Sequence, residues 1–152
     1  MAIDSTNNEA TLQLCDLMVV AINDPDNAWE VVFVAESQYE QRELLQSERV
    51  LVLLCPETPD VSTDRQQLSV ELTVIGKVAK ATRDDCDPIW NLYHQIRDFL
   101  SEQRFTINGE EVTWNPPGKP QWDRDRLATE RVVSLVGNLH YLQYLYLDDV
   151  TP

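Results

Sequence analysis

The sequence predicts an α+β domain: a mainly antiparallel sheet of about four strands, with two helices packed on one face and a small hairpin. Three observations support this prediction. Two segments repeat apolar residues at helical spacing, other segments are rich in β-branched residues or alternate with a period of two, and the links between successive strands are short. Short links favour antiparallel pairing, and helices that gather on one face of such a sheet are typical of the α+β class.

Length and composition indicate one folded domain over residues 1–152. Hydrophobic residues make up 43% of the chain, which excludes disorder. The longest apolar run is far below the ~20 residues of a membrane span, so we expect no membrane association. The N-terminus lacks the basic residues and apolar core of a signal peptide, which predicts a protein of the cytoplasm or of a particle assembled there. We expect residues 1–8 and 148–152 to fray.

The first predicted helix covers residues 9–23. Asn8 or Thr6 can cap it, because either side chain can accept from free amides of the first turn. Pro25 follows the helix and cannot continue its hydrogen-bond ladder. The residues expected to face the core are Leu14, Leu17, Met18, Ala21 and Ile22.

Three strands should follow. Residues 29–39 are rich in β-branched and aromatic side chains, and residues 49–55 form a continuous apolar run typical of a strand covered on both faces. A polar loop over residues 56–66 comes next. Residues 68–74 alternate apolar and polar side chains, which predicts a half-buried strand with one face in water.

The second predicted helix begins with Asp87 as its cap and Pro88 at its first position, where the missing N–H costs nothing. Its inward residues are expected to be Ile89, Leu92, Ile96, Phe99 and Leu100. Residues 106–112 then predict a hairpin, because Asn108 and Gly109 tolerate the positive φ values of a type I′ turn.

A long irregular loop is expected over residues 115–125, with a closing segment over residues 130–147. The closing segment fits either a helix or a strand, and its β-branched and aromatic content favours a strand. The strand would place Val133, Leu135, Leu139, Tyr141 and Leu145 inward and Ser134, Asn138 and His140 outward. Gly76 and Gly137 lie inside long strands, where glycine often marks a bulge or a close backbone approach.

No common catalytic or ligand-binding motif is present, so we predict no catalytic residues, no cofactor and no metal. The run Asp84, Asp85 and Asp87 lacks the glycine and distal glutamate of a calcium loop, and helix capping explains it better. His94 and His140 have no partner at ligand spacing. The three cysteines are odd in number and widely separated, which predicts reduced thiols, with the first two as small core residues: Cys15, Cys55 and Cys86.

The charge is strongly negative and unevenly distributed. The chain carries a formal charge of −14, with no Lys or Arg before Arg42 and none after Arg131. Binding to a phosphate backbone requires basic groups, so such a surface should repel nucleic acid. The charge either serves solubility or forms a wall past which DNA slides without sticking.

Four residues are candidates for a subunit interface: Trp114, Trp122, Arg124 and Arg126. Tryptophan and arginine are over-represented among interface anchors, and the two indoles lie at or near the ends of a proline-containing loop. The alternative is that this loop folds back and its indoles complete the core. The loop at residues 56–66 is a second candidate arm.

The order of elements resembles the tail terminator, or tail-completion, proteins of long-tailed bacteriophages. The segments that carry the resemblance are 50–54, 68–74 and 88–92, and the pattern extends over nearly the whole chain. The resemblance implies a non-enzymatic virion subunit that forms a ring, usually sixfold. Such a ring caps the tail tube, contacts the tube protein and head–tail connector proteins, and lets DNA pass without specific binding. No functional residue can be carried over, and the insert at residues 115–125 departs from the pattern.

Two other classes remain open. An acidic adaptor or inhibitor that binds a basic protein would be a monomer with carboxylates along one convex face. An enzyme with a dispersed active site would have a deep pocket with convergent polar groups near His94 or His140.

Overall fold

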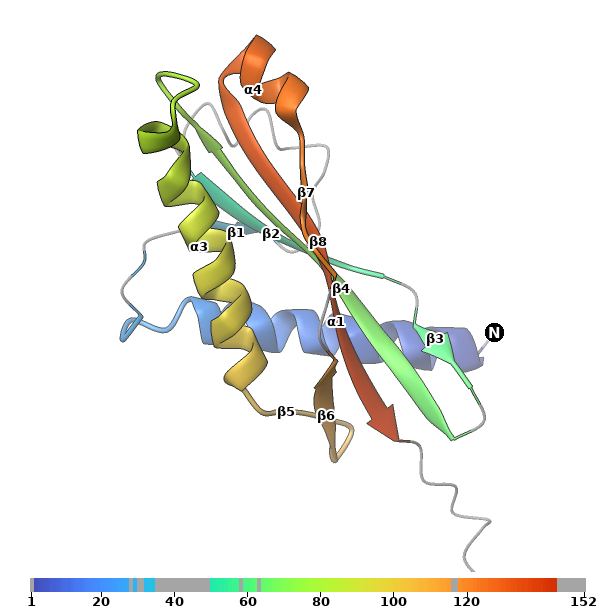
Figure 1. The fold of residues 1–152 in the computed structure, drawn as a ribbon. Coiled ribbons are helices and arrows are strands. Elements are labelled where there is room, and N and C mark those ends of the chain that lie inside the picture. The colour runs from blue at the N-terminus through green and yellow to red at the C-terminus, as the bar shows by residue number, and fades with distance from the viewer. Residues whose placement is uncertain are drawn as a thin grey trace, which may run out of the picture.

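The computed structural model describes residues 2–27, 29, 32–34, 50–57, 59–62, 64–115 and 118–144 (Figure 1). The α+β class predicted from the sequence is confirmed. In chain order the elements are α1 (Ala2–Ile22), β1 (Val32–Val34), β2 (Val50–Pro56), β3 (Asp60–Val61), β4 (Arg65–Lys77), α3 (Arg83–Glu102), β5 (Phe105–Ile107), β6 (Glu110–Asn115), β7 (Gln121–Trp122), α4 (Arg124–Glu130) and β8 (Val132–Tyr144).

The sheet is built around the two long strands β4 and β8. They pair antiparallel along their whole lengths of 13 residues each, from Arg65↔Tyr144 to Lys77↔Val132. The strand order is β1-β2-β4-β8-β6-β5, with β3 added to β4 and β7 added to β8. All these pairings are antiparallel except that of β1 with β2, which is parallel. The sheet has more than four strands because short segments extend its edges.

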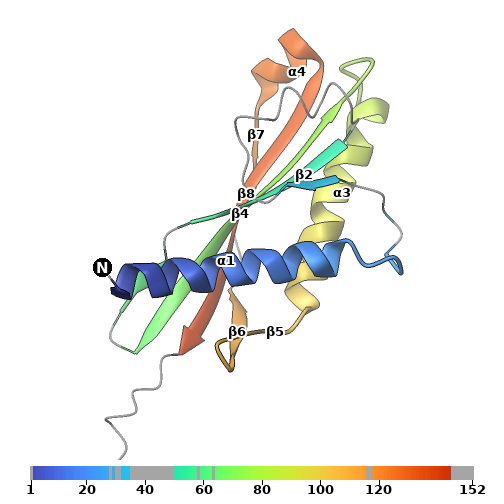
Figure 2. The same cartoon turned by 180° about the vertical axis from the view of Figure 1, so that it is seen from behind.

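The helices α1 and α3 pack on the same face of the sheet, and α1 crosses the lower half of the strands in Figures 1 and 2. This face carries one large apolar core, to which β4 and β8 contribute alternate residues. Its main members are Leu14, Met18, Ile22, Val52, Leu54, Leu68, Val70, Leu72, Val74, Ile89, Tyr93, Ile96, Leu100, Val133, Leu135, Leu139 and Tyr141. No helix within the described ranges is long and apolar enough to span a membrane.

The strand predicted at residues 68–74 is confirmed as part of β4, but the prediction that one of its faces is wet is wrong. Ser69 and Thr73 are buried, with exposed fractions of 7% and 5%. A second apolar cluster covers this opposite face beside them, formed by Leu51, Leu53, Ile75 and Val132. The strand β4 lies between β2 and β8, and side chains that project from these two strands on the same face flank its small residues.

The first helix begins earlier than expected. It includes residues 2–8, which we expected to fray, so Thr6 and Asn8 lie inside the helix and are not its caps. Its core face contains Leu14, Met18 and Ile22 as predicted, whereas Leu17 is 39% exposed.

The second helix also begins earlier, at Arg83. Its N-cap is Thr82, whose hydroxyl accepts from the backbone N–H of Asp85, so the assignment of Asp87 as cap and Pro88 as first residue is wrong. Phe99 and Leu92 are only half-buried and lie at the edge of the buried face. That face consists of Cys86, Ile89, Tyr93, Ile96 and Leu100. The ring of Phe99 instead packs edge-on against Trp29, with centroids 5.4 Å apart.

Several other predictions are confirmed. The closing segment is the strand β8, with Val133, Leu135, Leu139 and Tyr141 inward, although the predicted outward residue Ser134 is buried. The hairpin of β5 and β6 turns at two residues with positive φ, Asn108 at 53° and Gly109 at 84°. The apolar run at residues 50–54 is β2, buried on both faces.

The loops differ from the predictions in two places. The loop predicted at residues 56–66 contains the short strand β3, which pairs with β4. The loop predicted at residues 115–125 contains β7 and the start of α4. The predictions for residues 1, 30–31, 35–39, 49, 58, 63, 116–117, 145–147 and 148–152 lie outside the described residues.

The helix α3 lies along β8 at Gly137, where no side chain fits. A Cβ atom at Gly137 would overlap the hydroxyl oxygen of Tyr93, and Tyr93 is fully buried. The register of β4 with β8 continues through Gly137 and Gly76, so the glycine marks a close approach and not a bulge. No hydrogen-bond partner of the Tyr93 hydroxyl lies in the part of the chain that the structure describes.

We expect Gly137→Ala to lower the free energy of unfolding by about 1–3 kcal/mol, because the new methyl group overpacks the Tyr93 hydroxyl. Urea denaturation measures this change. Gly118→Ala is the matched control, since a Cβ there meets nothing within 4 Å, and it should change stability by less than about 0.5 kcal/mol. Tyr93→Phe should restore most of the loss in the double variant, and equal losses with and without the hydroxyl would contradict this account.

Candidate functional site

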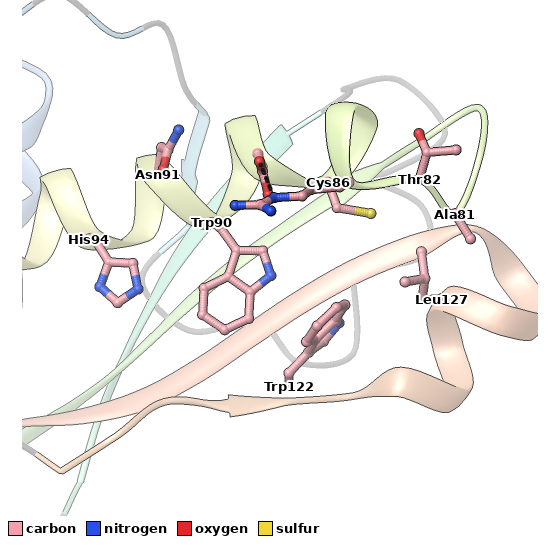
Figure 3. Close-up of a pocket in the computed structure, with 10 residues that line it drawn as sticks. Ala81, Thr82, Cys86, Trp90, Asn91, His94, Trp122 and Leu127 are labelled. Carbon is pink, nitrogen blue, oxygen red and sulfur yellow. Dashed lines mark hydrogen bonds and ion pairs between the residues drawn. The ribbon is translucent and has the colours of Figure 1, made fainter.

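Two adjoining hollows flank Trp90 on the outer side of α3. The first, of about 520 Å³, lies between α3, β7 and α4, and Figure 3 shows its lining. The second, of about 440 Å³, lies between α3 and the segment 118–120. Because both hollows share Trp90 and His94, we treat them as one site, the Trp90 cleft. Its lining residues are Ala81, Thr82, Arg83, Cys86, Asp87, Trp90, Asn91, His94, Arg97, Gly118, Lys119, Pro120, Trp122 and Leu127.

Aromatic rings form the floor of the cleft. The indoles of Trp90 and Trp122 meet edge to face, with centroids 5.3 Å apart and planes at 87°. The imidazole of His94 stacks on Trp90 at 5.8 Å and 24°. Both indoles are half-buried, and the buried Trp122 Nε1 has no hydrogen-bond partner among the described residues. The floor is therefore an apolar surface that remains partly open to solvent.

The position of Trp122 depends on strand pairing and a helix cap. Trp122 pairs with Leu135 of β8, and the next residue, Asp123, caps α4 by accepting from the N–H of Arg126 at 3.1 Å. The helix α4 then places Leu127 against the core. We did not predict α4, because seven residues are too few for an apolar period to be visible. The capping aspartate before a run of helix formers is the signal that identifies it.

The cleft is basic on an acidic molecule. Three cations line it, Arg83, Arg97 and Lys119, with the carboxylate of Asp87. Arg97 also pairs with the exposed carboxylate of Asp98 beside the cleft, at 3.3 Å. Arg83 pairs with Asp87 at 3.3 Å, but its side chain is 89% exposed, so the pair contributes little to stability. The guanidinium of Arg124 adds a further cation at the rim, 5.6 Å from the centroid of the Trp122 ring.

The structure brings only two of the four predicted interface residues to this cleft, Trp122 and Arg124. Trp114 lies on β6 opposite Tyr141, six residues along β8 from the partner of Trp122, or about 20 Å away. Its indole packs edge-on against Tyr141 at 5.3 Å. Arg126 pairs with Glu130 within α4 at 3.0 Å.

The contribution of α3 to this surface was not predicted from the sequence. Arg83, Trp90 and Arg97 recur at intervals of seven residues, and Asp87 and His94 fall four residues after the first two. This spacing places all five on one side of the helix. The stripe was present in the sequence, but its position beside Trp122 depends on the pairing of β7 with β8.

The environment of His94 disfavours its charged form. Burial beside the rings lowers the pKa of His94 below its ordinary value of 6.5, and the nearby Arg97 lowers it further, while Asp98 opposes this shift. At neutral pH the imidazole is therefore neutral, and it behaves as part of the aromatic floor.

The second histidine, His140, lies on the other face of the sheet among polar side chains. Ser69 Oγ is 2.8 Å from His140 Nδ1, and the amide of Gln67 lies 3.4 Å from the same nitrogen. A serine–histidine contact is one part of a nucleophilic site. However, such a site also needs N–H donors directed at the developing oxyanion. Ser69 lies within β4, one residue beyond its pairing with β2, and pairs directly across from His140 of β8, so cross-strand packing explains the contact.

Two of the three aspartates at the start of α3, Asp85 and Asp87, have structural partners. Asp85 Oδ2 accepts from the backbone N–H of Lys80 at 2.9 Å, and Asp87 pairs with Arg83. No group of three or more His, Cys, Asp or Glu side chains that could hold a metal occurs within the described ranges. The absence of metal, cofactor and catalysis stays a prediction.

No protein-family model matches this chain, and no curated protein was found that is similar to it in sequence.

We expect nuclear magnetic resonance titration of the His94 ring to give a midpoint below 6.5. The folded protein then binds fewer protons than the unfolded chain just below this pH, so this group's contribution to stability falls as the pH decreases through 6.5. His94→Gln should remove that contribution. Arg97→Gln should raise the His94 midpoint, because a neighbouring positive charge is lost, and a wild-type midpoint at or above 6.5 would refute the assignment.

Proposed function

We propose that this protein is a structural subunit that associates with copies of itself into a ring, in the manner of the phage tail terminators that its element pattern resembles. The observation that carries the proposal is the Trp90 cleft: an aromatic floor with a basic rim, on a chain with a formal charge of −14. Half-exposed tryptophans beside arginines are typical of the anchors of protein interfaces.

The distribution of charge favours a second copy of the same chain as the partner that binds the Trp90 cleft. A basic site on an acidic protein attracts acidic surfaces, and every further copy supplies one. A contact between two different surfaces of identical subunits runs head to tail, and it ends only when the chain of copies closes into a ring. In the proposed role the ring has six copies, caps a tail tube and contacts the tube protein and the connector proteins of the virion.

The remaining acidic surface suits a passage for DNA. Carboxylates that face a lumen repel the phosphate backbone, so DNA slides through without being held. The proposed ring would then be assembled in the host cytoplasm, become part of the virion and need no catalytic group. The competing role, an acidic adaptor for a basic protein, uses the same carboxylates but does not explain the basic cleft.

Native mass spectrometry over increasing protein concentration is expected to show one closed oligomer, and electron microscopy of the same sample should show a ring. The ring should not retain double-stranded DNA at physiological salt, because the net charge opposes binding. Since a tail tube can act as a template, the protein is also to be imaged in its native assembly. A solitary subunit there, or a one-to-one complex with a basic globular protein, would support the adaptor role.

A further inference from the structure

The outer face of α1 complements the Trp90 cleft. Three large apolar side chains are exposed on this face, Leu12 at 40%, Leu17 at 39% and Val20 at 71%, and the exposed carboxylate of Asp16 lies among them. These residues occupy one side of the helix, opposite the buried residues Leu14, Met18 and Ile22. A helix face of this kind combines apolar contact with negative charge.

We propose that the outer face of α1 of one copy docks as a helix into the Trp90 cleft of the next copy. This inference rests on the proposed ring and names the two surfaces that build it. Amphipathic helices that lie in grooves are a recurring mode of recognition. Here the apolar residues of α1 would cover the indoles of Trp90 and Trp122, and its carboxylate would meet the cations of the rim.

The charges of the two surfaces are opposite. Asp16 lies on the outer face of α1, the exposed Asp24 and Asp26 follow in the turn after the helix, and residues 10–27 contain no Lys or Arg. The cleft has three cations against one carboxylate. At physiological salt, charges further apart than about 8 Å are largely screened. The attraction between opposite charges at the contact therefore outweighs the repulsion between the net negative charges of the two molecules.

The cleft is long enough to take the exposed apolar face of α1. From Leu12 to Val20 this face extends about 12 Å, and from Arg83 to Arg97 the stripe on α3 extends about 21 Å. Both are straight helical surfaces, so one helix can lie along the other.

The positions of the surfaces make the contact head to tail. The helix α1 crosses the lower half of the sheet, whereas β7, α4 and the first turns of α3 lie at its upper end (Figures 1 and 2). One copy therefore presents its cleft while its own α1 stays available to another copy. This is the arrangement that a ring of identical subunits requires.

Exchanging the charges between the two surfaces tests the proposal. We expect Arg97→Glu with Lys119→Glu to weaken assembly at least about tenfold, and Asp16→Lys with Asp26→Lys to do the same, because like charges would then face each other. A chain with all four changes should assemble to within about threefold of the wild type, since each contact regains opposite charges. Native mass spectrometry measures the assembly, and circular dichroism checks that every variant is folded.

Matched controls use exposed charges outside both surfaces. Arg104→Glu and Asp64→Lys each reverse one charge of the same sign as those reversed in the cleft and on α1, and they should leave assembly unchanged. If the wild type forms a ring that the cleft and α1 variants leave intact, the ring stands and the docking inference falls. The inference also falls if both pairs of changes disrupt the ring and the fourfold variant does not recover. A wild type that never assembles, alone or on a tail tube, contradicts the proposed ring itself.

A disulfide test reports the contact directly. Val20→Cys with Asn91→Cys places one thiol on the exposed face of α1 and one in the cleft, and both native side chains are exposed. Oxidation is expected to link copies into a ladder on a non-reducing gel. Val20→Cys with Asp64→Cys is the control and should give no ladder above background. Equal ladders from both pairs would overturn the proposal.

Discussion

The contact between α3 and β8 positions both the apolar core and the Trp90 cleft. Tyr93 sits over Gly137, and the Tyr141 hydroxyl donates to the Leu100 carbonyl at 3.3 Å. Between these two points α3 advances about 10 Å and β8 about 13 Å, so the helix follows the strand closely. The same alignment brings Trp90 beside Trp122, because Trp122 pairs with β8 just before Gly137. The alignment of α3 with β8 therefore places both the core residues and the cleft residues.

Local patterns predicted much of the fold and little of the cleft. The alternation in β4 and β8 and the turn at Asn108 and Gly109 were visible because they depend on neighbours in sequence. The cap of α3 was misplaced because Pro88 suits a first helical position, yet the helix tolerates it at the cost of one backbone hydrogen bond. The burial of Ser69 and Thr73 depends on strands and clusters distant in sequence, which alternation alone does not reveal.

The cleft joins residues 81–97 with residues 118–127, two segments that meet only through the sheet. Composition selected Trp122 and Arg124, which line or border the cleft, as candidate interface residues, but the same reasoning selected Trp114, which lies at the far end of β8. The net charge likewise predicted an acidic surface overall, but it did not reveal the basic residues that line the Trp90 cleft. A single average over 152 residues cannot show that three cations and two indoles line the same cleft.

The uninterrupted ladder of β4 and β8 has a mechanical consequence. Thirteen paired residues extend about 40 Å, with α1 across one half and the cleft at the other end. Such a ladder is stiff along its length, because stretching it breaks many hydrogen bonds together. Any assembly that uses both ends of the subunit inherits its spacing from these strands, so its diameter is a property of the backbone and is insensitive to changes in the loops.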